Sequence, residues 1–238
     1  MTGQPFKFKQ FTIQQDKCAM KIGTDAVLLG SWADVSHNPE NILDIGAGSG
    51  VISLMLAQRS TAEIIDAVEI ESDAYEQCVS NFENSLWNDR LFCYHASLQE
   101  FVEEIDDCYD LIVSNPPFYS ENYKTNNAQR DQARFQDALP LEHLLYAASK
   151  MLSKKGRFAV IIPFDKENRL IELAEEAALY PARLLRVKGN SSSNLKRSLI
   201  EFSFQKNKTQ IEELVIETER HNYTEEYIKL TKDFYLKM

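Results

Sequence analysis

Short apolar runs alternate with longer segments in which apolar residues recur every three or four positions, and this pattern covers most of the chain. The runs have the length of buried strands, and the longer segments have the periodicity of amphipathic helices. The predicted strands are residues 42–45, 64–69, 91–94, 110–114, 157–163, 183–188 and 198–205. The predicted helices are residues 26–33, 51–58, 72–83, 140–151, 166–178 and 224–235, with a helical turn at 98–102. This alternation predicts an α/β fold with a doubly wound, mostly parallel seven-stranded sheet whose last strand is antiparallel.

Two element boundaries carry recognisable local chemistry. Thr24 and Asp25 precede the apolar helix 26–33 and are candidates to cap its amino end. Lys155 and Gly156 follow helix 140–151 and are expected to turn the chain into the strand at 157–163.

The length of 238 residues is enough for one substantial core. No internal repeat or long polar linker divides the chain, so we expect a single domain over residues 1–238, with short extensions at 1–40 and 207–238. The longest apolar runs, such as 158–162, are too short to cross a bilayer, and residues 1–15 do not resemble a signal peptide. The four cysteines form no Cys-x-x-Cys pair and have no nearby histidine cluster. A cytoplasmic monomer without a metal site or membrane contact is expected.

The formal charge of −10 is unfavourable for binding nucleic acid, but the charge is unevenly distributed. Residues 183–208 contain one acid, Glu201, and seven basic residues: Arg183, Arg186, Lys188, Lys196, Arg197, Lys206 and Lys208. Two interpretations stay open. The segment is either a sheet edge kept soluble by basic side chains or a face directed at phosphates.

A glycine loop follows the strand at 42–45. Gly46, Gly48 and Gly50 form a Gly-x-Gly-x-Gly pattern just after Asp44, and Glu69 ends the next strand. Glycine permits a tight turn and a close approach of a ligand to the backbone, and a carboxylate at the second strand end can accept hydrogen bonds from both ribose hydroxyls. A nucleotide-like cofactor site is predicted, although the pattern alone does not separate it from a dinucleotide site, which spaces its glycines differently.

The segment Asn115-Pro116-Pro117-Phe118 directly follows the strand at 110–114, where an open α/β sheet presents its ligands. The Asn115 side-chain oxygen and the Pro116 carbonyl can accept hydrogen bonds from a planar amine, and two prolines fix the corner that aims them. These bonds localise the nitrogen lone pair, which makes the amine a better nucleophile. Phe118 can stack on the flat substrate. The predicted reaction is group transfer to an amine conjugated to a ring or carbonyl.

Upstream, residues 18–30 include Lys21 and Thr24 ahead of the first helix. The amino end of a helix offers N–H donors to a carboxylate, and Lys21 could add positive charge. The alternative is a helix that packs on the sheet and binds no ligand.

The order of these three segments, Lys-Ile-Gly-Thr-Asp, then Leu-Asp-Ile-Gly-Ala-Gly-Ser-Gly, then Asn-Pro-Pro-Phe-Tyr, closely resembles the tRNA1(Val) (adenine-37-N6)-methyltransferases. The resemblance runs from about residue 6 to residue 236. It implies a Rossmann-like class I methyltransferase fold, S-adenosyl-L-methionine as cofactor, and tRNA as substrate. The implied cofactor-binding residues are Lys21, Thr24, Asp44, Gly46, Gly48, Gly50, Glu69, Ser97 and Asn115, and the implied catalytic residues are Asn115, Pro116 and Phe118.

One position departs from the family pattern. Many relatives carry an Asp that binds the cofactor adenine where this chain reads His95-Ala96-Ser97, so Ser97 is the candidate for this contact. The Asn-Pro-Pro-aromatic corner also serves enzymes that methylate the side-chain amide of glutamine. A protein glutamine N5-methyltransferase is therefore the alternative.

Overall fold

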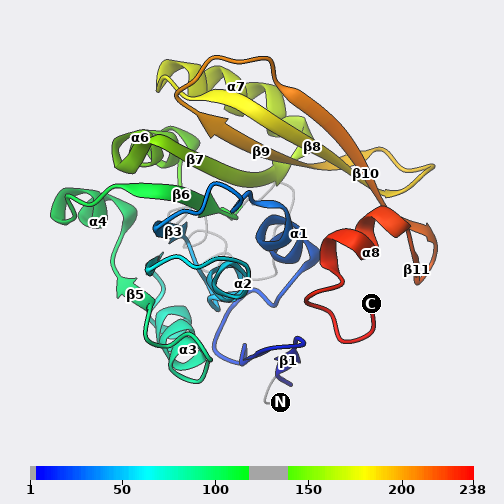
Figure 1. Ribbon diagram of the computed structural model, residues 1–238, viewed down its shortest axis with the longest axis horizontal. Coiled ribbons are helices and arrows are strands. Elements are labelled where there is room, and N and C mark those ends of the chain that lie inside the picture. The colour runs from blue at the N-terminus through cyan, green and yellow to red at the C-terminus, as the bar shows by residue number, and fades with distance from the viewer. Residues whose placement is uncertain (1–3, 118–138) are drawn as a thin grey trace, which may run out of the picture.

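A nine-stranded sheet runs through the part of the chain that the computed structural model describes, residues 4–117 and 139–238 (Figure 1). The order of its strands is β11-β10-β8-β9-β7-β6-β3-β4-β5. The strands are β3 (Asn41–Ile45), β4 (Ile64–Glu69), β5 (Leu91–His95), β6 (Tyr109–Ser114), β7 (Leu152–Pro163), β8 (Tyr180–Asn190), β9 (Leu195–Ser203), β10 (Gln210–Glu219) and β11 (Asn222–Tyr223).

The seven strands β3 to β9 match the sheet predicted from the sequence. Strands β3 to β7 pair in parallel, and β9 lies antiparallel between β7 and β8. The prediction of a mostly parallel sheet with an antiparallel last strand is therefore confirmed for this part. The C-terminal extension adds two strands beyond the predicted seven, because β10 pairs in parallel with β8 and β11 pairs with β10.

Helices cover both faces of the sheet, as a doubly wound fold requires. The helices are α1 (Thr24–Trp32), α2 (Val51–Arg59), α3 (Ser72–Glu83), α4 (Leu98–Glu104), α6 (Leu141–Met151), α7 (Glu167–Glu176) and α8 (Glu225–Thr231). Alternate residues of β6 point to opposite faces: Leu111 and Val113 join the core under α1 and α2, whereas Ile112 joins the core under α4, α6 and α7. Two apolar cores, one on each face, thus hold the sheet rigid beneath its strand ends.

Two predicted boundaries are wrong, each for a local physical reason. Helix α1 begins at Thr24, after Gly23, and no side chain caps it, so Thr24 is its first residue rather than its cap. Lys155 and Gly156 lie inside β7, because this strand begins directly after α6 at Leu152. A Cβ on Gly156 would stand 2.8 Å from the Tyr109 carbonyl oxygen, so glycine is needed for close strand packing and not for a turn.

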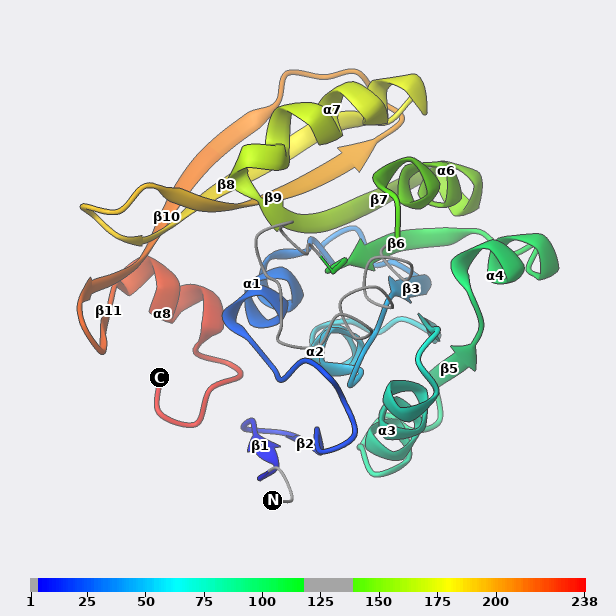
Figure 2. The same cartoon turned by 180° about the vertical axis from the view of Figure 1, so that it is seen from behind.

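The two extensions of the chain lie against each other (Figure 2). The N-terminal hairpin consists of β1 (Phe6–Lys7) and β2 (Thr12–Ile13). Phe8 forms a β-bridge with Tyr235, and the Lys9 backbone N–H donates to the Phe234 carbonyl over 2.9 Å. Within the described residues, no helix combines the length and the apolar character needed to span a membrane.

Candidate active site

The glycine loop, Glu69 and Asn115 gather at one edge of the sheet. Strands β6, β3 and β4 are neighbours and run in parallel, with Ser114 beside Ile45 and Ile45 beside Val68. Their carboxyl ends therefore bring together the glycine loop after β3, Glu69 at the end of β4, and Asn115 after β6. This is the edge at which open α/β sheets bind ligands.

The three glycines of the loop have different roles. All have positive φ, at 74°, 57° and 78° for Gly46, Gly48 and Gly50. A Cβ on Gly46 or Gly48 would meet no described atom within 4 Å, so these two leave open space beside the backbone. A Cβ on Gly50 would stand 2.5 Å from the Phe82 ring, so Gly50 lets α3 pack under the loop. The structure thus places Gly46 and Gly48, but not Gly50, beside room for a ligand.

This difference gives a testable prediction. Gly50→Ala should lower the free energy of unfolding by about 1–3 kcal/mol through overpacking, in addition to about 1–2 kcal/mol for the left-handed backbone. Gly48→Ala should lower the free energy of unfolding by the backbone contribution alone. It should also weaken ligand binding, because its methyl group enters the open space. Thermal unfolding and ligand calorimetry of both variants separate the two effects. Equal stability of the two variants would contradict the packing role of Gly50.

Asp44 is fully buried beneath the loop. Its Oδ2 atom accepts hydrogen bonds from the Ser53 backbone N–H (3.1 Å) and the Ser53 hydroxyl (2.7 Å), at the start of α2. Its Oδ1 atom has no hydrogen-bond partner among the described residues. Burial raises the pKa of Asp44 to about 6, against the two Ser53 hydrogen bonds, which lower it. A buried carboxylate oxygen without a partner suits a cationic group of a ligand.

Glu69 anchors the glycine loop. Its side chain is 8% exposed, its Oε2 atom accepts the Gly48 N–H over 2.7 Å, and its Oε1 atom accepts the Glu71 N–H over 2.9 Å. The sequence predicted a ribose acceptor here. Each carboxylate oxygen has a further lone pair for that role, and the Gly48 contact adds a second role that the sequence did not reveal.

The Asn115-Pro116-Pro117 corner after β6 is held in place by a hydrogen bond of the residue that precedes it. The Ser114 hydroxyl donates to the Ile45 carbonyl over 2.9 Å, which ties the end of β6 to the end of β3. Asn115 follows as a partly buried residue, and Pro116 is buried. Phe118 lies outside the described residues. The corner is therefore attached directly to the strand that leads into the glycine loop.

Two of the remaining predicted cofactor residues, Lys21 and Ser97, have local hydrogen-bond partners. The Lys21 ammonium donates to the Gln15 and Cys18 carbonyls of its own segment, and Thr24 is exposed on the first turn of α1. Ser97 caps α4, since its hydroxyl donates to the Glu100 carboxylate (2.7 Å) and accepts the Glu100 N–H (3.2 Å). The Ser97 hydroxyl is therefore used to cap the amino end of α4.

The basic segment is not the sheet edge that one interpretation expected, because β10 covers β8. Four of its cations form ion pairs, namely Arg183 with Glu201, Arg186 with Glu167, Lys188 with Glu213 and Arg197 with Asp25. The excess of positive charge along the sequence thus overstates the charge available to a partner. Lys196 is exposed, at the tip of the β8–β9 hairpin.

In the described part of the chain, no three His, Cys, Asp or Glu side chains come together as a possible metal site.

The sheet order and the glycine loop after β3 define the class I methyltransferase fold. A crystal structure of a predicted O-methyltransferase from Agrobacterium tumefaciens has this fold, with a TM-score of 0.66 and 19% identity over 88% of this chain and 96% of that one. The family model for the methyltransferase small domain matches residues 21–175. The chain is therefore a methyltransferase of this family.

Full-length relatives identify the family more specifically. The tRNA1(Val) (adenine(37)-N6)-methyltransferase of Christiangramia forsetii is 62% identical over 240 residues, and all of both chains are covered. The protein of the same name from Flavobacterium johnsoniae is 63% identical over 234 residues, which cover 98% of this chain and 100% of the relative. The chain belongs to the tRNA1(Val) (adenine(37)-N6)-methyltransferase family, and the resemblance inferred from the motif order is confirmed.

Proposed function

We propose that this protein transfers a methyl group from S-adenosyl-L-methionine to the exocyclic N6 of adenine 37 in tRNA1(Val). The observation that carries the proposal is the attachment of the Asn115 corner to the strand beside the glycine loop, in a chain that is 62% identical over its full length to a relative of that name. A cofactor site and an amine-binding corner on adjacent strand ends are what direct methyl transfer requires.

The residues present fit the cofactor. Gly46 and Gly48 leave space that no described atom fills, and the Oδ1 atom of Asp44, which has no partner among the described residues, suits a positive charge. Glu69 would accept hydrogen bonds from the ribose. Lys21 and Ser97 would complete the site after giving up or sharing their present partners, together with the exposed Thr24. When bound, the cofactor supplies an electrophilic methyl group on a sulfonium.

The chain's own contribution to the reaction is the orientation of the amine. The Asn115 side-chain oxygen and the Pro116 carbonyl accept hydrogen bonds from the two N–H groups of the amine. These hydrogen bonds localise the nitrogen lone pair and direct it toward the methyl donor. No strong base is needed, since the amine becomes acidic only after methylation. We assign stacking on the base to Phe118.

The buried carboxylate predicts a pH dependence of cofactor binding. Asp44 has a pKa of about 6 in the folded chain, above its ordinary value, so the protein without ligand loses stability as the pH rises from about 4 to about 6. A cationic ligand prefers the ionised carboxylate. Affinity for S-adenosyl-L-methionine should therefore fall by up to about tenfold for each pH unit below 6. Calorimetry should show this slope in the natural protein and a flat response in Asp44→Asn; a slope that persists in Asp44→Asn assigns it to another group.

The ion pairs around β8 and β9 change the expected source of tRNA affinity. Arg183→Glu should chiefly destabilise the fold, since Glu201 is fully buried and loses one of its two arginine partners. Lys196→Glu should leave stability unchanged and weaken tRNA binding. Binding should fall by about 10³-fold or more between roughly 50 and 200 mM salt if six or more phosphates are contacted. Filter binding at several salt concentrations tests this, and a flat salt response argues against phosphate contacts.

A transfer assay tests the proposed substrate. Tritiated S-adenosyl-L-methionine is supplied with a tRNA1(Val) transcript and with a matched transcript that carries guanine at position 37. We expect label only in the first. Label in a protein substrate, with none in either tRNA, would overturn the proposal and favour glutamine N5-methylation. We further propose that the chain acts as a single domain, residues 1–238, and as a monomer in the cytoplasm, where its tRNA substrate is found.

A further inference from the structure

A segment without regular secondary structure passes beside the glycine loop. We call residues 14–23, between β2 and α1, the N-terminal strap. Cys18 in the strap is 6% exposed. Burial and then the charge of Glu69 raise the pKa of its thiol to about 11.

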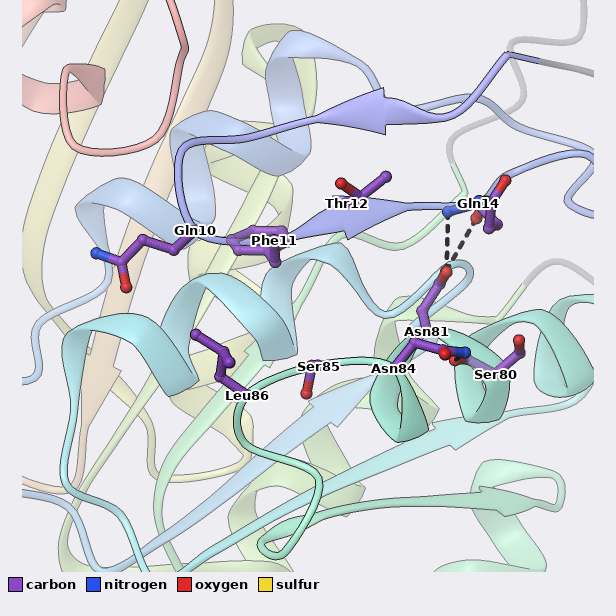
Figure 3. A pocket seen from close by; sticks show the side chains of 9 residues that line it. All are labelled: Gln10, Phe11, Thr12, Gln14, Ser80, Asn81, Asn84, Ser85 and Leu86. Atoms are coloured by element: carbon purple, nitrogen blue, oxygen red, sulfur yellow. Dashed lines mark hydrogen bonds between the residues drawn. The ribbon is translucent and has the colours of Figure 1, made fainter.

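The strap is held by two buried amides on α3. Gln77 and Asn81 are 4% and 3% exposed and lie one helical turn apart, on the face that an amphipathic helix normally fills with apolar residues. Gln77 Oε1 accepts the Lys17 N–H over 3.1 Å. Asn81 Oδ1 accepts the Gln14 N–H, and Asn81 Nδ2 donates to the Gln14 carbonyl, both over 2.9 Å (Figure 3).

Asn81 also contacts the glycine loop. Its Nδ2 atom donates to the Ser49 carbonyl over 2.8 Å. One side chain therefore satisfies three backbone groups, two in the strap and one between Gly48 and Gly50. Since buried amides are costly unless they are paired, this arrangement ties the strap to the loop at a defined separation.

A groove lies beside this tie. This groove of about 580 Å³ separates β2 from the end of α3, and polar side chains such as Gln10, Thr12 and Asn84 line it (Figure 3). Gln14 and Asn81 also line this groove, and the hydrogen bonds between them join its two sides (Figure 3).

We propose that Asn81 is a positioning residue for cofactor binding, which holds the N-terminal strap against the glycine loop so that the strap forms the outer wall of the cofactor site. Gln77 supports it from the preceding turn. This inference rests on the proposed use of S-adenosyl-L-methionine. It assigns to α3 a role in cofactor affinity and none in the methyl transfer step.

The test combines kinetics with limited proteolysis. Asn81→Ala should raise the KM for S-adenosyl-L-methionine and the Kd for S-adenosylhomocysteine by about tenfold or more, from the loss of three hydrogen bonds. At saturating cofactor, kcat should stay within about twofold, because the Asn115 corner is intact. Trypsin should cleave faster after Lys17 and Lys21, which are exposed in the strap. S-adenosylhomocysteine should slow this cleavage.

Asn84→Ala is the matched control. Asn84 is the same residue type on the same groove. Among the described residues, its side chain hydrogen-bonds only with the Ser80 carbonyl of the same helix. Its KM and its cleavage rate should equal those of the natural protein. Asn81→Asp keeps the acceptor for the Gln14 N–H but loses both donors, so it should show most of the effect.

Two failures can be told apart. Natural protein that binds no S-adenosylhomocysteine contradicts the proposed function itself. If the natural protein and Asn81→Ala bind S-adenosylhomocysteine with the same affinity and trypsin cleaves their straps at the same rate, only the positioning role is contradicted. If the Asn81 variants do not fold, Gln77→Ala decides the question, since it loses only the Lys17 contact. Unchanged affinity and unchanged cleavage in Gln77→Ala would then overturn the inference.

Discussion

Replacement of Asn115 by alanine is expected to lower kcat for tRNA methylation by about 10²- to 10³-fold, the usual effect of removing one preorganised polar contact to the reacting group. The Kd for S-adenosyl-L-methionine should change little, since the Asn115 oxygen acts mainly on the amine of the substrate. Single-turnover kinetics at saturating cofactor and tRNA would separate the chemical step from binding.

Two variants sharpen this result. Asn115→Asp keeps an acceptor oxygen and should retain more activity than Asn115→Ala. Asn41 lies at the opposite end of the neighbouring strand β3, so Asn41→Ala should behave as the natural protein. A kcat of Asn115→Ala equal to that of the natural protein would remove the amine-orienting role from this residue.

Replacement of Glu69 by alanine is expected to weaken S-adenosyl-L-methionine binding by about 10²- to 10⁴-fold. The carboxylate would accept hydrogen bonds from two ribose hydroxyls, and hydrogen bonds to a charged group contribute about 1.5–3 kcal/mol each. It also holds the Gly48 and Glu71 N–H groups. The loss combines the proposed ribose contacts with a loosened glycine loop. Calorimetry measures the change in Kd, and thermal unfolding measures how much of it accompanies a loss of stability.

Glu71→Ala is the control for this prediction. Glu71 is an exposed carboxylate two residues further along, and its backbone N–H remains in place in the variant. Its cofactor affinity should match that of the natural protein. Unchanged affinity in Glu69→Ala would place the cofactor elsewhere.

The sequence predicted the parts of the fold that depend on local pattern. The alternation of strands and helices identified β3 to β9, and the positions of Gly48, Glu69 and Asn115 at the carboxyl ends of three parallel strands predicted that they share one edge. This works because parallel strands separated by helices leave few possible arrangements, and their carboxyl ends necessarily meet. The boundary error at Gly156 arose because a glycine can serve either a turn or a close contact. The error at Thr24 arose because the residue before the first helical turn is Gly23, which has no side chain to cap it.

The interactions between distant segments could not be predicted in the same way. Glu201 pairs with Arg157 and Arg183 only because β9 lies between β7 and β8, so a charge count along the chain misjudged the basic segment. The anchoring role of Glu69 depends on the loop conformation. Asn81 resembles any polar helix residue in the sequence until α3, the strap and the glycine loop are placed together. Its one sequence signal is an amide in the apolar stripe of α3, beside Cys78 and Phe82.

The central claim is that this chain methylates adenine 37 of tRNA1(Val), and nucleoside mass spectrometry of that tRNA tests it most directly. The tRNA is purified from cells that lack the protein and from the same cells after they regain either the natural chain or Asn115→Ala. We predict that N6-methyladenine at position 37 is absent without the protein, returns with the natural chain and stays nearly absent with Asn115→Ala. Unmodified adenine 37 in cells with the natural chain, or N6-methyladenine that persists in cells without it, would contradict the account.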